Sequence, residues 1–462
     1  MKNSFLSASI IYFIGNILLK GIAFFTLPIF SRIMLPEDFG MYSLYTASLG
    51  ILTIFVGLQI NGTVNISFGN KSIERFESYV SNITLFPLLG LFIGLISLAI
   101  LPNLIDLIQV PTMAFGIMMM IQAFFSIVTS IYQSELVIKS QPKKHFVFSI
   151  VATLSNVILS LSFVLMLKDN TYFARVISGV LSNGLVGMYV LVKFIPRVDL
   201  KRLKQDWIDG LKLSLPLIFH NLSNQLLNVA DRYMIASWRN ATDVAIYSFS
   251  YTIGSIMDMI WLSINNAWIP WYFSQLKDNN KELIKLYSKQ YIIFFVWLTC
   301  CFVLVSPELI YFMGGKQYVD GIYIIPLIVL GYFFVFLYSF YVNYQFYRQK
   351  TTLIPIATTS AAVINIILNI LLIPPFGLIG AAITTAISYF IMLMFHYTMT
   401  VHVLKHRDMP TAYLWLAILF MVCFILFTYV ILQYMFIRFI LIVVLCIIYA
   451  TYVLRIIKSF KR

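Results

Sequence analysis

Apolar segments long enough to cross a membrane follow one another along almost the whole chain. A bilayer core of about 30 Å takes about 20 apolar helical residues to cross. Because 60% of the 462 residues are apolar and only 11% are charged, the expected fold class is an all-α polytopic membrane protein. The fourteen predicted transmembrane helices are Ser9–Met34, Met41–Ile66, Ile83–Ile105, Met113–Ile138, Phe146–Leu167, Ala174–Val192, Leu213–Trp238, Val244–Ser274, Tyr291–Met313, Ile322–Asn343, Leu353–Ile373, Leu378–Val401, Ala412–Leu432 and Phe439–Ile457.

The basic residues predict how these helices are oriented. If the N-terminus lies inside, 24 of the 32 Lys and Arg residues fall in cytoplasmic segments, as the positive-inside rule requires. Both termini are therefore expected on the cytoplasmic side, with the first apolar run kept as a helix. The net charge of +14 then needs no nucleic-acid partner to explain it.

An internal repeat divides the predicted helices into two lobes. At offsets of 205 and 209, shared polar residues recur within membrane segments. The matched pairs are Asn16 with Asn221, Asp38 with Asp243, Asn61 with Asn266, and Asn156 with Asn365. The prediction is two pseudo-symmetric six-helix lobes, residues 1–192 and 213–401, with an appended helix pair and basic tail at 411–462. Many transporters are built from such repeats and bind substrate between them.

The longest connection is the basic segment 193–212. It carries apolar residues among its charges, which fits an amphipathic helix lying on an anionic membrane surface. A solvated linker fits equally well.

Lys20 is a cation in the middle of the first predicted helix, where insertion costs about 2.5–3.5 kcal/mol. In the seventh helix, five polar residues follow at spacings that put them on one face: Asn221, Asn224, Gln225, Asn228 and Arg232. By the repeat, Asn16 and Lys20 are the counterparts of this face. The prediction is a cationic cavity for an anionic ligand. Two alternatives remain open: the amides hydrogen-bond neighbouring helices, or Lys20 pairs with a buried acid such as Asp258.

Other charged residues have less certain roles. Asp258 is either a coupling group for a proton or cation, or a structural partner. Asp231 and Arg232 lie within two turns of the outer end, and Arg32 is better explained as an interfacial anchor. Glu135 and Lys139 are spaced for a helical ion pair.

No constellation for catalysis or cofactor binding is found. The four cysteines, at 300, 301, 423 and 446, have no metal-ligand spacing, and the chain contains no Walker P-loop, HExxH or DxD motif. The expectation is a protein that is not an enzyme and that has no cofactor, apart from H⁺ or Na⁺ coupling.

Three stretches carry a family resemblance: "KGIAFFTLPIFSRIMLPEDFGMYSL", "ADRYMIASWRNATDVAIYSFSYTI" and "NIILNILLIPPFGLIGAAITTAISY". They resemble the Wzx-type bacterial polysaccharide flippases of the multidrug/oligosaccharidyl-lipid/polysaccharide exporter superfamily. The resemblance implies transfer of an undecaprenyl-pyrophosphate-linked oligosaccharide, such as an O-antigen repeat unit, to the outer leaflet of the bacterial inner membrane. It implies alternating access through a central cationic cavity, with Lys20, Arg232 and Arg32 as candidate cations. Fourteen helices exceed the twelve common in this branch, although related lipid II flippases have two extra.

Membrane lipid and a polysaccharide polymerase or ligase are the further partners to expect. Two rival functions stay open. A cation-coupled drug antiporter of the same superfamily would depend on embedded acids such as Asp258. A membrane-embedded polymerase or glycosyltransferase would need a large polar loop or a sugar-nucleotide site, and the sequence has neither.

Overall fold

The computed structural model describes residues 15, 18, 19, 21, 22, 24–70, 72–107 and 109–460. All regular elements in this part of the chain are helices. The chain forms two compact units, Met1–Tyr233 and Met234–Arg462. The division falls inside a helix rather than in the segment 193–212.

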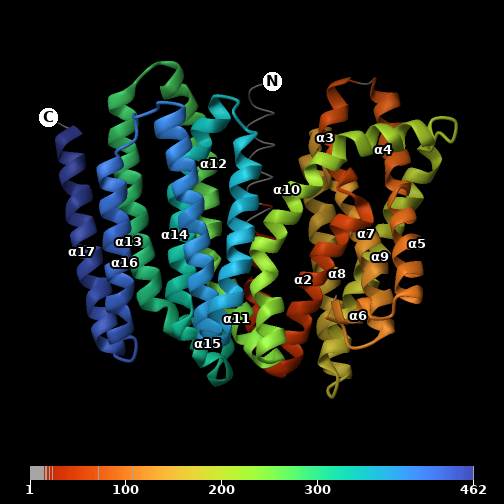
Figure 1. Cartoon of the computed structure of the whole chain (residues 1–462), viewed down its shortest axis with the longest axis horizontal. Coiled ribbons are helices and arrows are strands. Elements are labelled where there is room, and N and C mark those ends of the chain that lie inside the picture. The colour runs from red at the N-terminus through yellow and green to blue at the C-terminus, as the bar shows by residue number, and fades with distance from the viewer. Residues whose placement is uncertain are drawn as a thin grey trace. The chain divides into compact units, whose positions relative to one another are not determined.

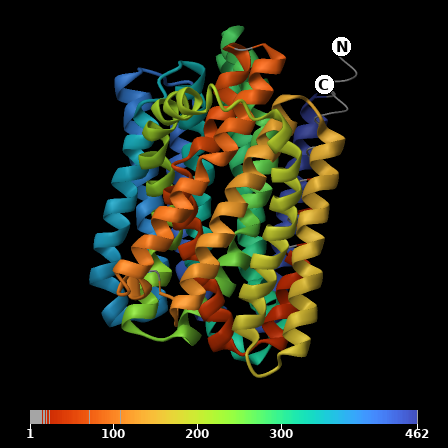
Figure 2. The same cartoon turned by 90° about the vertical axis from the view of Figure 1, so that its right-hand side faces the viewer.

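The first unit is built around the long helix α7. Short segments surround it at the helix ends, and long helices lie alongside it (Figure 1). Its elements are Phe24–Ile33, α2 (Pro36–Gly57), η1 (Ile60–Gly62), α3 (Thr63–Ser67), η2 (Phe68–Asn70), α4 (Ile73–Leu85), α5 (Pro87–Ile100), α6 (Leu104–Leu107), α7 (Met113–Ile138), α8 (Pro142–Met166), α9 (Thr171–Phe194), η3 (Ile195–Arg197) and α10 (Leu203–Trp238). A buried apolar core joins α4, α7 and α9 through residues such as Val80, Ile127 and Val190. The long orange and yellow helices of this unit run roughly parallel in the side view as well (Figure 2).

The second unit surrounds α14, most of whose side chains are buried. Its elements are α11 (Ala241–Gly254), α12 (Ile256–Lys277), α13 (Lys281–Gly314), η4 (Lys316–Tyr323), α14 (Ile325–Tyr347), α15 (Leu353–Thr398), η5 (Met399–Val403), α16 (Thr411–Ile431) and α17 (Met435–Phe460). The predicted appended pair corresponds to α16 and α17. Arg438 fixes α17 to α13: its guanidinium donates to Glu308 Oε1 and to the Leu304 carbonyl, both at 2.6 Å.

Ten helices of the described chain are long and apolar enough to span a membrane, and the other predicted spans have structural counterparts. The first is described from Phe24 to Ile33, the seventh is the more polar α10, and the eighth is divided at Ser255 into α11 and α12. The eleventh and twelfth form one continuous run, α15, that turns at Gly377 (φ 57°). Thr384 donates to Asn369 across this turn, although the two would lie about 22 Å apart in a straight helix.

The second predicted span, Met41–Ile66, is wrong at its C-terminal end. Helix α2 stops at Gly57, and both Leu58 and Gln59 have left-handed backbones, with φ of 44° and 57°. This conformation is unfavourable for residues with a Cβ, and the apolar residues that follow it, such as Ile60 and Ile66, extended the predicted span past it. The chain resumes as short helical segments instead of one continuous span.

Segment 193–212 is docked on the first unit. Its second half begins α10, and the buried Asp206 receives two bonds from the Arg75 guanidinium. Asn82 Nδ2 also donates to Asp206, at 2.7 Å, and Trp207 Nε1 donates to the Asn82 carbonyl, at 2.7 Å. Of the two alternatives open in the sequence, a freely solvated linker is wrong. Pro216 lies ten residues further along α10.

His406, in the connection between η5 and α16, makes stability dependent on pH. Its ring stacks on Tyr344 with centroids 3.7 Å apart, and burial lowers its pKa to about 4, aided by Lys281 and opposed by Asp408. Since the unfolded-state pKa is about 6.5, the stabilisation is complete above pH 6.5. It is lost as the pH falls toward 4, because the unfolded state binds the proton more readily.

The change is worth about 3 kcal/mol across this window. We expect the variant His406→Gln to lose this part of the pH dependence, measured as the apparent unfolding temperature in detergent from pH 7.5 to 4. Equal slopes for the two proteins would contradict this assignment.

Candidate functional site

The polar face predicted on the seventh helix lies on α10, and part of it packs against α2. Asn221 Nδ2 donates to Gln59 Oε1 at 3.0 Å, and Gln59 is one of the two left-handed residues directly after α2. The Tyr233 and Ser48 hydroxyls lie 2.6 Å apart. Broken helices in transporters are tolerated where the irregular backbone is buried in protein or lines a polar cavity.

Gln225 lies in the same contact. A Cβ added to Gly50 would collide with Gln225 Nε2, so glycine at position 50 makes room for the amide. We call this contact the polar seam; it consists of Ser48, Gly50, Gln59, Asn221, Gln225 and Tyr233. Amide hydrogen bonds between helices are therefore one real role of the predicted face.

Two of the four amides of the face remain outside the polar seam. Asn224 is exposed, and Asn228 Nδ2 donates to the Asn224 carbonyl at 2.8 Å. Both lie on α10, which corresponds to the seventh predicted span. An exposed polar group on a membrane helix is costly unless water or a ligand meets it. The spacing that grouped the face correctly could not show this division.

The predicted charges lie in different environments. Asp231 is buried, and its carboxylate accepts the backbone N–H of Arg232 at 2.9 Å. Arg232 is half-buried, and Arg32 is exposed at the end of the helix Phe24–Ile33. Asn16 and Lys20 lie outside the described residues.

Asp258 belongs to the second unit. It lies in the first turn of α12, half-buried, and interacts electrostatically with Tyr338 and Tyr389. Asn265, two turns further along the same face of α12, accepts a hydrogen bond from Asn343 at 2.9 Å. This part of the α12 face is thus structural.

Arg175, in the second turn of α9, is a further cation of the first unit. Its guanidinium carbon lies 3.8 Å from the Phe30 ring centroid and 4.4 Å from that of Tyr42. Stacking of this kind holds a guanidinium while leaving its edge available for a planar anion. The signal in the sequence was weak, because Arg175 is only four residues into α9.

The predicted Glu135–Lys139 ion pair is confirmed, at 2.6 Å. The pair is part of a larger ionic cluster that the spacing did not indicate. Lys139 also bonds Glu77 at 2.5 Å, and Arg197 bonds Glu135 at 3.2 Å. This cluster neutralises its own charges and joins α4, α7 and the segment after α9.

Sequence comparisons place this architecture among known proteins. The family model described as "Polysaccharide biosynthesis protein" matches residues 5–277, and a second model, MatE, matches residues 216–371. An uncharacterized membrane protein of Haemophilus influenzae is 25% identical over 399 residues, covering 84% of this chain and 92% of the relative. The capsular polysaccharide biosynthesis protein CapF of Staphylococcus aureus is 22% identical over 398 residues, covering 83% and 96%.

Solved structures show the same fold. The lipid II flippase MurJ, in an inward closed conformation, superposes with a TM-score of 0.77 at 15% identity, covering 97% of this chain and 99% of that one. An inward-facing multidrug transporter of the MATE family gives 0.65 at 13% identity, covering 84% and 95%. Since the first family model spans more than half of the chain, the protein belongs to the polysaccharide biosynthesis protein family, within the multidrug/oligosaccharidyl-lipid/polysaccharide exporter superfamily.

Proposed function

We propose that the protein is a flippase for an undecaprenyl-pyrophosphate-linked oligosaccharide, an O-antigen unit or a similar repeat, in the bacterial inner membrane. The lipid would move from the cytoplasmic to the outer leaflet by alternating access. The observation that carries the proposal is the exposed amide of Asn224 on α10, with the half-buried Asn228 one turn further on, in a chain whose family is named for polysaccharide biosynthesis. Amides donate to and accept from sugar hydroxyls, whereas a small apolar drug would not use them.

The charged head group needs cations as well. A pyrophosphate desolvated in a membrane protein requires a nearby counter-charge. Lys20 and Arg232 are our first candidates for this role, Arg32 a weaker one, and the ring-stacked Arg175 a new one. Asp258 or Asp231 would couple transport to H⁺ or Na⁺, and a polymerase or ligase would use the product outside.

Deleting the gene tests this function against both rivals. Loss of a flippase should abolish surface polysaccharide and leave complete lipid-linked oligosaccharide in the cytoplasmic leaflet, with rescue by the wild-type chain. Single repeat units reaching the outer leaflet would indicate a polymerase. Normal polysaccharide combined with drug sensitivity would indicate an antiporter, which the MatE match at 216–371 also allows.

The division of the α10 face gives a sharper prediction. We expect Asn224→Leu to lower transport about 5- to 10-fold, which corresponds to the free energy of about one hydrogen bond. Stability should fall little, because Asn224 is exposed. The matched variant Asn221→Leu leaves Gln59 without its donor and should lower stability first. Rescue assays at equal membrane abundance and unfolding temperatures measure the two effects; the opposite pattern would contradict the assignment.

A further inference from the structure

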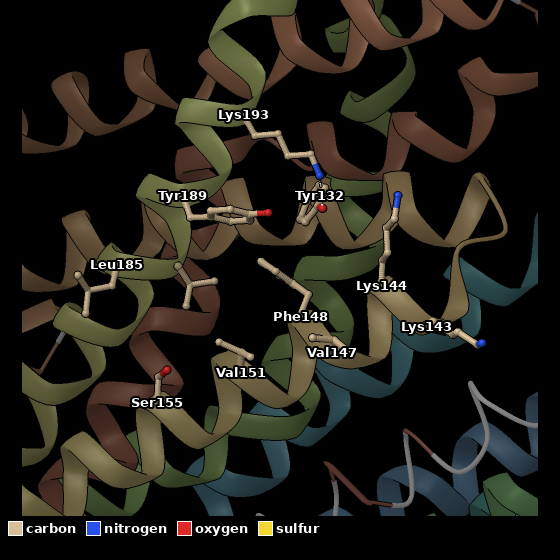
Figure 3. Close-up of a pocket in the computed structure, with 11 residues that line it drawn as sticks. Tyr132, Lys143, Lys144, Val147, Phe148, Val151, Ser155, Leu185, Tyr189 and Lys193 are labelled. Atoms are coloured by element: carbon tan, nitrogen blue, oxygen red, sulfur yellow. Dashed lines mark hydrogen bonds between the residues drawn. The ribbon is translucent and has the colours of Figure 1, made fainter.

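A groove of about 670 Å³ lies between α7, α8 and α9 of the first unit. Its size is within the range of small-ligand sites, about 300–1,000 Å³. Figure 3 shows the residues that line it, which extend along α8 from Lys143 to Ser155 and along α9 from Leu185 to Lys193. They are Tyr132, Lys143, Lys144, Val147, Phe148, Val151, Ser155, Leu185, Val186, Tyr189 and Lys193.

One end of the groove is positively charged. Lys193 Nζ donates to the Tyr132 hydroxyl and lies 4.3 Å from the centroid of its ring. In Figure 3 the Lys144 ammonium and the Tyr189 hydroxyl lie at this same end, while Lys143 points away. The contact with Tyr132 fixes the position of the Lys193 charge.

The lysines of the groove are not neutralised by nearby acids. Among the residues that the structure describes, no carboxylate oxygen lies within 4.0 Å of the Lys143, Lys144 or Lys193 ammonium. The neighbouring cations Lys139 and Arg197 do have such partners, in Glu77 and Glu135. The groove therefore keeps an uncompensated positive charge that favours an anion.

The rest of the groove is an apolar wall exposed on membrane helices. Val147, Val151 and Leu185 are 58%, 53% and 66% exposed, as expected of side chains that face lipid. The positive-inside rule assigns the lysine-bearing ends to the cytoplasmic side. An occupant must therefore combine an anionic head at the cytoplasmic interface with an apolar chain.

We propose that this groove binds an anionic phospholipid of the cytoplasmic leaflet. Its phosphate lies at the Lys144 and Lys193 ammonium groups, and one acyl chain follows Val147, Val151 and Leu185. Basic pockets between transmembrane helices bind anionic lipid head groups in this way. A glycan-bearing lipid fits less well, because Ser155, Tyr132 and Tyr189 are the only uncharged polar side chains in the lining.

Lipid titration of the purified full-length chain, followed by native mass spectrometry, tests the proposal. Phosphatidylglycerol should bind more tightly than zwitterionic phosphatidylethanolamine. The double variant Lys144→Gln/Lys193→Gln should bind phosphatidylglycerol about 30-fold more weakly, since each basic residue near a membrane surface contributes about 1 kcal/mol. Its binding of phosphatidylethanolamine should not change.

Two further variants separate this site from general charge and from misfolding. Lys277→Gln/Lys285→Gln removes the same charge from exposed positions of the second unit and should bind like wild type. Val151→Trp keeps every lysine but fills the apolar wall, and should also lose phosphatidylglycerol. The proposal is overturned if either groove variant, shown to be folded by its unfolding temperature, binds phosphatidylglycerol normally. It is also overturned if undecaprenyl pyrophosphate displaces phosphatidylglycerol from the groove at lower concentration.

Discussion

Replacing Asp206 with alanine is expected to destabilise the first unit by about 3 kcal/mol. The carboxylate is fully buried and receives hydrogen bonds from Arg75 and Asn82. Removing one member of a buried pair leaves the other charge uncompensated, which costs about 3–5 kcal/mol. We take the lower end of this range because the Arg75 side chain is 22% exposed.

The apparent unfolding temperature in detergent and the abundance in membranes measure this effect. Asp209→Ala is the matched control: Asp209 is one turn along α10 and accepts an exposed bond from Gln205, so its loss should stay within about 0.5 kcal/mol. The double variant Arg75→Met/Asp206→Leu, which removes both charges, should recover part of the loss. Equal stability of Asp206→Ala and Asp209→Ala would show that the buried contact contributes nothing.

Replacing Lys20 with alanine is expected to lower the delivery of surface polysaccharide about 10- to 100-fold at matched protein abundance. The reason comes from the sequence: a cation in the middle of a membrane segment persists only where an anion or water meets it. A charge-assisted hydrogen bond to a pyrophosphate would contribute about 1.5–3 kcal/mol, which corresponds to this range of rates. Lys20→Arg keeps the charge and should retain most of the delivery.

Arg32→Ala is the comparison on the same segment: Arg32 is exposed at the helix end, so its removal should lower delivery much less than the removal of Lys20. Normal delivery by Lys20→Ala would mean that the lysine is structural or incidental, and the head group would then have to be sought at Arg232 or Arg175. A drug antiporter predicts the reverse result, with Lys20 tolerant and Asp258→Asn inactive.

Local sequence signals predicted the helices and the contacts between residues close in the chain. Hydropathy located the membrane segments, including the reversal at Gly377, and the spacing of four residues predicted the Glu135–Lys139 pair. These features depend on interactions within one or two turns, so the pattern of residue types is sufficient.

The parts that were missed depend on contacts between distant residues. Asp206 meets Arg75 across 131 positions, and Arg438 meets Glu308 across 130. No spacing rule predicts such pairs. The end of α2 was missed for another reason. Apolar residues such as Ile60 and Ile66 continue among polar ones after Gly57, so the predicted span ran on past the left-handed backbone at Leu58 and Gln59. Likewise, spacing grouped the α10 amides but could not separate Asn224 from the polar seam.

Pro216 divides the first 31 residues of α10 into two straight helical parts. The first part is held near its N-terminal end, where Arg75 and Asn82 donate to Asp206 and Trp207 donates to the Asn82 carbonyl. The second part carries Asn221, Gln225 and Tyr233. A proline removes one backbone hydrogen bond and makes a helix compliant at that point. Bending at Pro216 would tilt the second part and strain its contacts with α2. The first part would keep its contacts with Arg75 and Asn82.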